Sequence, residues 1–169
     1  SGETALSGAL KPIKNEKGIF GLMDFSKVEK PGQYYLVIND RVKSGCFDIR
    51  EHVMEEAAWK VLNFIYSERC GFPVGGGHSS CHEDILATHN GLSMVYSGGW
   101  HDAGDLSQQT LQTGEVAQAL FELAAAVKED TLLSGRLMEE ACWGLDLVLR
   151  SRFGDGVRAF SVGISRWTN

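Results

Sequence analysis

The pattern of apolar and polar residues changes near residue 50. Before that point the apolar residues come in short runs. Residues 33–38 are rich in β-branched and aromatic side chains and follow Pro31–Gly32, a turn signal. A second run covers residues 42–49, after a break at Asn39–Asp40. The pattern predicts two short strands. Since two strands cannot bury themselves alone, they are either the end of a larger β-domain or pack on the part of the chain after residue 50.

After residue 50 the apolar residues recur at steps of three and four, the period of an amphipathic helix. This spacing predicts helices over residues 51–70, 108–128 and 131–152. Residues 71–106 show no period and are rich in glycine. A loop of this length is usually functional or disordered, and its aromatic residues argue against disorder. The order of helix, long loop, helix, helix predicts the opening of an all-α domain built from antiparallel hairpins.

Composition narrows the class of partner. The chain has 169 residues, 43% of them hydrophobic and 22% charged, as in an ordinary globular protein. Its formal net charge of −6 argues against nucleic acid, which is bound by basic faces, and fits a neutral or cationic substrate better. The sequence has no apolar run of about 18 residues, so a membrane is not an expected partner.

The segment GGWHDAGD, residues 98–105, carries the candidate chemistry. Asp102 and Asp105 stand three residues apart in a glycine-framed loop, where one carboxylate can take a proton from a water that the other orients. Trp100 and Tyr96 could offer flat faces to sugar rings. Spacing alone leaves a simpler alternative open, in which Asp105 caps the following helix and Asp102 is a turn residue.

The segment SGGWHDAGD, with the helix after it, resembles the signature of glycoside hydrolase family 9, in which tyrosine or histidine precedes the first aspartate. The resemblance implies that Asp105 is the catalytic base and that Asp102 helps to hold the water. NFIYSERCG and HSSCHEDI resemble the family's first barrel helix and next loop, and EEACWGLDLVLRSRFGDG resembles a later helix. MDFSKVEKPGQYYLVI and SGCFDI resemble the end of the immunoglobulin-like domain that precedes many of its catalytic domains.

The resemblance implies a mostly α fold. Residues 51–169 are expected to be the N-terminal part of an (α/α)6 barrel, and residues 1–50 the C-terminal part of an immunoglobulin-like β-sandwich. The implied function is hydrolysis of β-1,4-glycosidic bonds in glucans or related oligosaccharides by an inverting mechanism. The alternative function is a non-catalytic carbohydrate-binding or zinc-stabilised module. The family further implies a secreted, periplasmic or cell-envelope location.

The family's general acid is a glutamate near the far C-terminal end, so the resemblance implies a fragment that is inactive alone. Glutamates in this chain do not match the acid's motif and are expected on solvated helix positions: Glu115, Glu122, Glu139 and Glu140. Three helices would leave apolar faces open, so the missing C-terminal half or a self-associated oligomer is an expected partner. The residues expected on these faces are Leu120, Leu123, Leu145 and Val148.

Cys70, His78, Cys81 and His82 form a C-x7-H-x2-C-H cluster of nitrogen and sulfur ligands, which is typical of a structural zinc site. A disulfide between Cys70 and Cys81 is the main alternative. Some family 9 enzymes with the immunoglobulin-like domain resemble this pattern and hold a structural zinc near this loop. In that comparison His78 matches least well, and Glu83 or Asp84 could replace it.

No organic cofactor is expected, and the family's calcium sites belong to later loops. His101, inside the motif, is expected to hydrogen-bond a sugar hydroxyl or one of the aspartates. Cys142 is expected to be a buried thiol inside a helix, and His52 and His89 to be surface residues.

Overall fold

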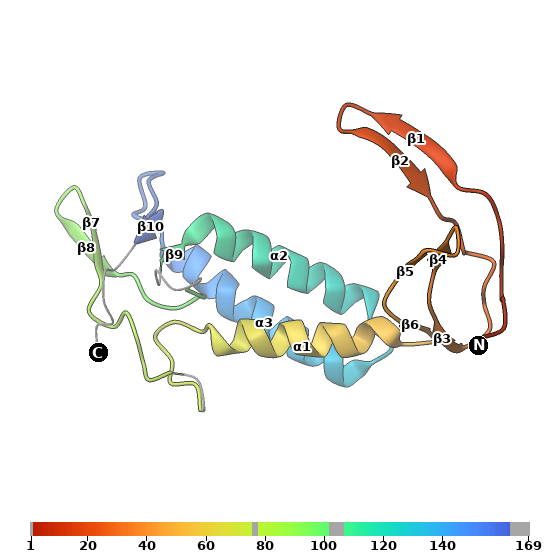
Figure 1. Ribbon diagram of the computed structural model, residues 1–169. Helices are drawn as coiled ribbons and strands as arrows, with labels where there is room; N and C mark the ends of the chain where they lie inside the picture. The colour runs from red at the N-terminus through yellow and green to blue at the C-terminus, as the bar shows by residue number, and fades with distance from the viewer. Residues whose placement is uncertain (1, 76–77, 102–106, 163–169) are drawn as a thin grey trace. The chain divides into compact units, whose positions relative to one another are not determined.

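The computed structural model describes residues 2–75, 78–101 and 107–162. The chain forms two compact units, residues 1–56 and 57–169. Strands dominate the first unit and helices the second, as the ribbon in Figure 1 shows. In the described part of the chain, none of the helices is both long and apolar enough to cross a membrane.

The strands of the first unit pair antiparallel. The pairs are β1 (Lys11–Asn15) with β2 (Gly18–Leu22), β3 (Gly32–Tyr34) with β6 (Phe47–Ile49), and β4 (Val37–Ile38) with β5 (Val42–Lys43). Each of the two predicted strands is therefore divided in two. Ser44 causes the interruption: its backbone N–H donates to Leu36 O at 3.0 Å, and its Oγ accepts from Leu36 N at 2.9 Å.

The three predicted helices are confirmed, with ends that shift by at most three residues. They are α1 (Val53–Ser67), α2 (Thr110–Ala126) and α3 (Thr131–Arg150). Helix α3 begins where predicted because the side chain of Asp130 caps it, accepting from Leu133 N at 3.0 Å. Helix α2 begins after Gln109, whose side chain makes no cap hydrogen bond.

A hairpin in the long loop was not predicted. Strands β7 (Leu86–His89) and β8 (Leu92–Val95) pair antiparallel around Asn90–Gly91. Both turn residues have positive φ angles, 49° and 76°, which is the Asn-Gly turn that closes two-residue hairpins. A second pair joins β9 (Gln108–Gln109) to β10 (Ser161–Val162).

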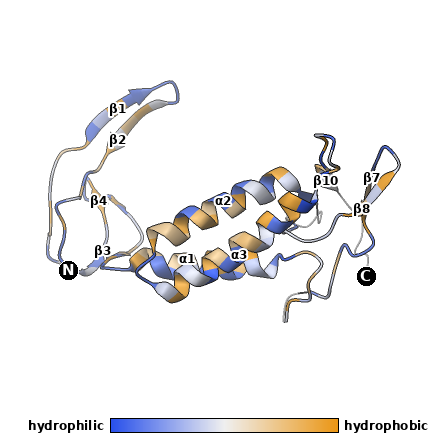
Figure 2. Cartoon of the chain, turned by 180° about the vertical axis from the view of Figure 1, so that it is seen from behind, coloured by the Kyte–Doolittle hydropathy of each residue, from blue (hydrophilic) through white to orange (hydrophobic). Residues whose placement is uncertain are grey.

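The core of the helical unit lies between the three helices, which run side by side in Figures 1 and 2. Its buried members are Leu62, Trp100, Ala117, Leu120, Ala124, Leu133, Leu137 and Ala141. The prediction that Leu120 is exposed is wrong, because the α2–α3 hairpin buries it to 4% exposure. Leu145 is exposed as predicted, and Leu123 and Val148 are partly buried. Cys142 is exposed, contrary to prediction.

Gly144 on α3 is a position where the core leaves no room for a side chain. A Cβ at Gly144 would lie 2.3 Å from the ring of Trp100. We expect Gly144→Ala to lower the free energy of unfolding by about 1–3 kcal/mol through overpacking. Gly135, on the same helix, has no atom within 4 Å of its would-be Cβ, and serves as the control.

Gly135→Ala is expected to raise the free energy of unfolding by about 0.5–1 kcal/mol, the usual helix-propensity gain. Urea unfolding followed by circular dichroism measures both changes. Equal effects of the two substitutions would contradict the tight contact between Trp100 and the backbone of α3.

Candidate active-site loop and metal centre

The predicted catalytic residues Asp102 and Asp105 lie outside the described residues. The backbone on either side of them is described. An isolated antiparallel bridge pairs His101 with Gln108. The side-chain amide nitrogen of Gln108 donates to Gly98 O, and its Oε1 has no partner in the described part of the structure. The two ends of the segment that holds the aspartates are therefore joined.

Hydrogen bonds to the residues just after α1 and to α3 hold the backbone before the aspartates. Gly99 O accepts from Cys70 N at 2.9 Å and from Trp143 Nε1 at 2.7 Å. His101 N donates to Glu68 O at 3.1 Å. Gly99 has a φ of 62°, and a Cβ there would lie 2.6 Å from a methyl carbon of Leu147, so the conformation requires glycine. The glycines of the motif thus let this backbone lie close to α3.

Trp100 and Tyr96, predicted to stack on sugars, are buried instead, with exposed fractions of 8% and 2%. Trp100 Nε1 donates to Glu140 Oε1 at 2.8 Å. The hydroxyl of Tyr96 donates to Phe160 O at 3.0 Å and lies 2.7 Å from Thr110 Oγ1. Burial also raises the pKa of Tyr96. In this structure both rings support the loop from inside the fold.

Glu140 is the clearest error of the sequence prediction, which placed it on a solvated helix face. Its side chain is 2% exposed, and it forms an ion pair with Arg69, which is 7% exposed. Arg69 Nη2 lies 2.8 Å from Oε2, and Arg69 Nε donates to both carboxylate oxygens at 3.1 and 3.2 Å. The buried Arg69–Glu140 pair connects the end of α1 to the middle of α3.

A cluster of four metal-ligand side chains lies beside this loop. One ligand atom from each of Cys70, Cys81, His82 and His101 lies within 4.8 Å of the others, and all four residues are buried. His82 Nδ1 is 2.9 Å from Cys70 Sγ, and His101 Nδ1 is 3.6 Å from Cys81 Sγ. His82 has a φ of 58°, a left-handed conformation that non-glycine residues seldom adopt and that is often found at functional sites.

The fourth member of this cluster differs from the prediction. His101, expected to contact a sugar or an aspartate, takes the place expected for His78. The ring of His78 contacts backbone carbonyls instead, with Nδ1 2.6 Å from Ser79 O and Nε2 3.1 Å from Ser67 O. Glu83 and Asp84 are exposed and are also not among the four.

The two cysteines of the cluster are free thiols with their sulfurs 3.7 Å apart, so the alternative of a disulfide is not what the structure contains. The hydrogen bond that they share raises the pKa of Cys70 and lowers the pKa of Cys81, which the two histidines lower further. Metal ligands bind as thiolates, so a divalent cation held by this cluster would take up both sulfurs in the deprotonated form.

A carboxylate orients one of the histidines. Glu68 Oε2 lies 3.3 Å from Nε2 of His101, while Nδ1 of the same ring faces Cys81. A carboxylate at the second nitrogen is the usual way in which proteins fix the tautomer of a metal-binding histidine. Two sulfurs and two nitrogens match the donor set of a structural zinc site, and the carboxylate of Glu68 orients one of those donors.

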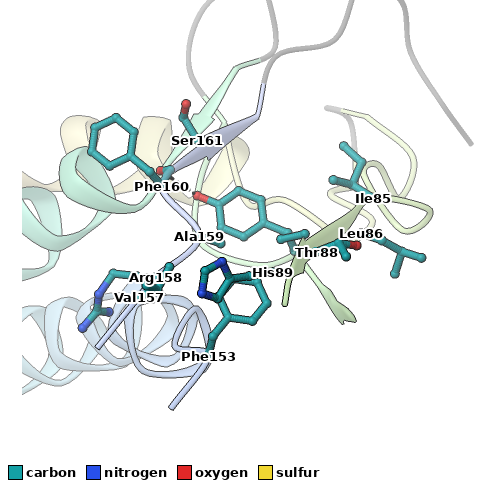
Figure 3. A pocket seen from close by; sticks show the side chains of 12 residues that line it. Ile85, Leu86, Thr88, His89, Phe153, Val157, Arg158, Ala159, Phe160 and Ser161 are labelled. Atoms are coloured by element: carbon teal, nitrogen blue, oxygen red, sulfur yellow. Dashed lines mark hydrogen bonds between the residues drawn. The ribbon is translucent and has the colours of Figure 1, made fainter. Parts of the chain in front are cut away.

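A shallow cleft lies between the β7–β8 hairpin and residues 153–161, and Figure 3 shows its lining. Of the predicted site residues that the structure describes, Tyr96 alone contributes to this lining. His89, predicted to be a surface residue, is partly exposed at the edge of the cleft, and its Nε2 lies 2.9 Å from Asp155 Oδ2. This contact connects the hairpin to the segment after α3.

Comparison with known proteins finds endoglucanases that are similar to this chain. No family model matches the chain. Endoglucanase D of Acetivibrio thermocellus is 27% identical over 157 residues, which covers 80% of this chain and 25% of the relative. The chain thus spans about a quarter of the length of this curated relative.

Solved structures with a fold similar to that of this chain are also endoglucanases. The glycoside hydrolase family 9 endoglucanase J30 is 24% identical, with a TM-score of 0.62, over 85% of this chain and 32% of its own. A Zn-binding triple mutant of the same endoglucanase is 25% identical, with a TM-score of 0.58, over 85% and 31%. A thermostable endoglucanase of Alicyclobacillus acidocaldarius is 19% identical, with a TM-score of 0.68, over 99% and 35%. These similarities in sequence and fold confirm the resemblance of the chain to glycoside hydrolase family 9.

Proposed function

We propose that this chain carries the water-activating part of an inverting glycoside hydrolase that cleaves β-1,4 bonds in glucans or related oligosaccharides. The main support is the loop that contains the aspartate pair. The backbone before Asp102 is fixed by hydrogen bonds to Glu68 and Cys70, just after α1, and to α3, and the His101–Gln108 bridge closes the segment. The relatives reported above, all endoglucanases, support the substrate class, and a further structure of similar fold, AaCel9A, was solved with cellobiose-like isofagomine.

In this mechanism Asp105 accepts a proton from a water molecule, and Asp102 orients the same water. The water oxygen attacks the anomeric carbon on the face opposite the leaving group, and a glutamate outside these 169 residues protonates the leaving oxygen. The bond from the anomeric carbon to the leaving oxygen breaks as the new bond forms. The configuration at that carbon is therefore inverted.

The test is the configuration of the first product. The full-length protein is mixed with cellooligosaccharides in an NMR tube, and the anomeric proton signals are followed before mutarotation. We expect the α-anomer to appear first. First appearance of the β-anomer would overturn the inverting mechanism. Binding by calorimetry without any release of reducing sugar would instead support the non-catalytic carbohydrate-binding module.

The domain assignment belongs to the same proposal. Residues 1–50 form the last part of an immunoglobulin-like β-domain, and residues 51–169 form the first part of an (α/α)6 barrel. Observed support is the order of strands followed by helices, together with the fold similarity to family 9 structures. Exposed apolar residues on the helices would be covered by the remaining hairpins of the barrel: Val61, Phe64, Leu111, Leu132 and Leu149. A secreted or cell-envelope location follows from the same family.

We also propose that Cys70, Cys81, His82 and His101 hold one structural zinc ion. A bound zinc would neutralise the thiolates and tie the residues after α1 to the loop before the aspartates. Four protein ligands leave no open position for water, so the ion contributes to folding and not to the reaction. Metal analysis of the purified protein should find one zinc per chain, and a metal-free protein of full stability would contradict this role.

A further inference from the structure

We propose that Glu140 is a positioning residue, which fixes the backbone that leads into the catalytic aspartates by holding the indole of Trp100. The inference rests on the proposed function, because it concerns the loop that carries Asp105. Glu140 lies on α3, 35 positions after that aspartate, within the segment EEACWGLDLVLRSRFGDG, whose resemblance to the family gave this glutamate no role.

The carboxylate of Glu140 is itself held rigidly. Arg69 donates to both of its oxygens, and Trp100 Nε1 donates to Oε1. The guanidinium of Arg69 is enclosed by aromatic rings, 4.6 Å from the ring centre of Trp143 and 4.8 Å from that of Tyr66. With its position set by charge, hydrogen bonds and ring contacts, the carboxylate is a fixed point for the indole N–H.

The indole is fixed in a second direction by the helix itself. Gly144 follows Glu140 by one helical turn, and a Cβ there would lie 2.3 Å from two ring carbons of Trp100. The ring therefore lies against the bare backbone of α3 while its N–H reaches Glu140 Oε1. These two residues form a slot that admits the indole in one orientation.

A gain in stability does not explain why the Arg69–Glu140 ion pair is buried. Desolvating two charges consumes most of their attraction, so a buried pair is often no more stabilising than apolar residues of the same size. An orienting role accounts for it better. Trp100 is two residues before Asp102. The backbone at Trp100 pairs with Arg69, just after α1, and the backbone at His101 pairs with Gln108. A shift of the indole would therefore be transmitted along the backbone towards the aspartates.

The first variant is Glu140→Gln in the full-length protein, assayed on cellooligosaccharides. Loss of the carboxylate charge weakens the hold on both Arg69 and Trp100. We expect kcat to fall by about 10- to 100-fold with KM changed less than about threefold, as for a displaced catalytic group. Glu115→Gln, at an exposed position on α2, is the matched control and should keep the wild-type kcat.

Trp100→Phe keeps the proposal testable if Glu140→Gln fails to fold, because it removes the indole N–H together with part of the ring and leaves both residues of the ion pair in place. We expect kcat to fall by about tenfold, and the acidic limb of the pH profile of kcat/KM to move because the surroundings of the base change. A purely structural role would lower the melting temperature and the active fraction without moving that limb. In the double variant the losses should not multiply, since both act through one hydrogen bond.

Asp105→Ala, assayed beside these variants, separates two kinds of failure. If Asp105→Ala abolishes hydrolysis while folded Trp100→Phe keeps the wild-type kcat and pH profile, the positioning role is wrong and the proposed function stands. If Asp105→Ala itself keeps the wild-type rate, the proposed function is wrong and the inference falls with it.

Discussion

Asp105→Ala in the full-length protein is expected to lower kcat by about 10²- to 10⁴-fold, the usual contribution of a positioned general base. The substrate's KM should change little, because a carboxylate that acts on water makes few contacts with the sugar in the ground state. Asp102→Ala should cost less, since it removes the group that orients the water and leaves the group that takes its proton. The measurement is the initial rate of reducing-sugar release, with product analysis by chromatography.

The control for this comparison is Glu122→Ala, which removes an exposed carboxylate from α2, where its Oε1 accepts from Gln118 at 2.9 Å. Its rate should equal that of the wild type. A larger loss for Asp102→Ala than for Asp105→Ala would exchange the two roles. Equal rates for all three variants and the wild type would remove the aspartate pair from the mechanism.

Removal of zinc has the second-largest expected effect, and it falls on stability. A ligand that binds only the folded state at about 1,000 times its dissociation constant adds about 4 kcal/mol to the free energy of unfolding. Dialysis against a strong chelator should therefore lower the melting temperature of the protein by several degrees, and added zinc should restore it. Differential scanning calorimetry at fixed protein concentration measures both changes.

The chain offers a matched pair of variants for the fourth ligand. His101→Ala should lose stoichiometric zinc, whereas His78→Ala should retain it, because His101 lies in the four-atom cluster and His78 contacts carbonyl oxygens of residues 67 and 79. Glu68→Gln should weaken zinc binding by about 10- to 100-fold through the misoriented imidazole of His101. Retention of zinc by His101→Ala together with its loss from His78→Ala would restore the assignment made from the sequence.

The helices could be predicted because their burial follows a local period. On α3 the buried positions Leu133, Leu137, Ala141 and Leu147 recur at helical spacing. Glu140 and Gly144 belong to the same stripe, and that was the available signal that this glutamate is buried. Its partner Arg69 is 71 residues away, so spacing along the chain could not reveal the pair.

The sequence prediction missed His101 as a metal ligand for a related reason. Sequence spacing favoured His78 because it stands between Cys70 and Cys81, within one short stretch. The fold instead pairs Arg69 with Trp100, which brings His101 beside the end of α1. The β7–β8 hairpin, in contrast, had a local signal in Asn90–Gly91 between two apolar runs. Antiparallel bridges between distant segments are not encoded in any local pattern.

His101 belongs to the four-ligand cluster and directly precedes Asp102 in the chain. The family signature that this segment resembles has either tyrosine or histidine at this position. In the proposed zinc site, tyrosine at position 101 would remove one of the four ligands. The two buried thiolates would then lose the metal charge that neutralises them. Across related sequences, tyrosine at position 101 should therefore be accompanied by loss of the donors at positions 70, 81 and 82, so that these four positions change together in evolution.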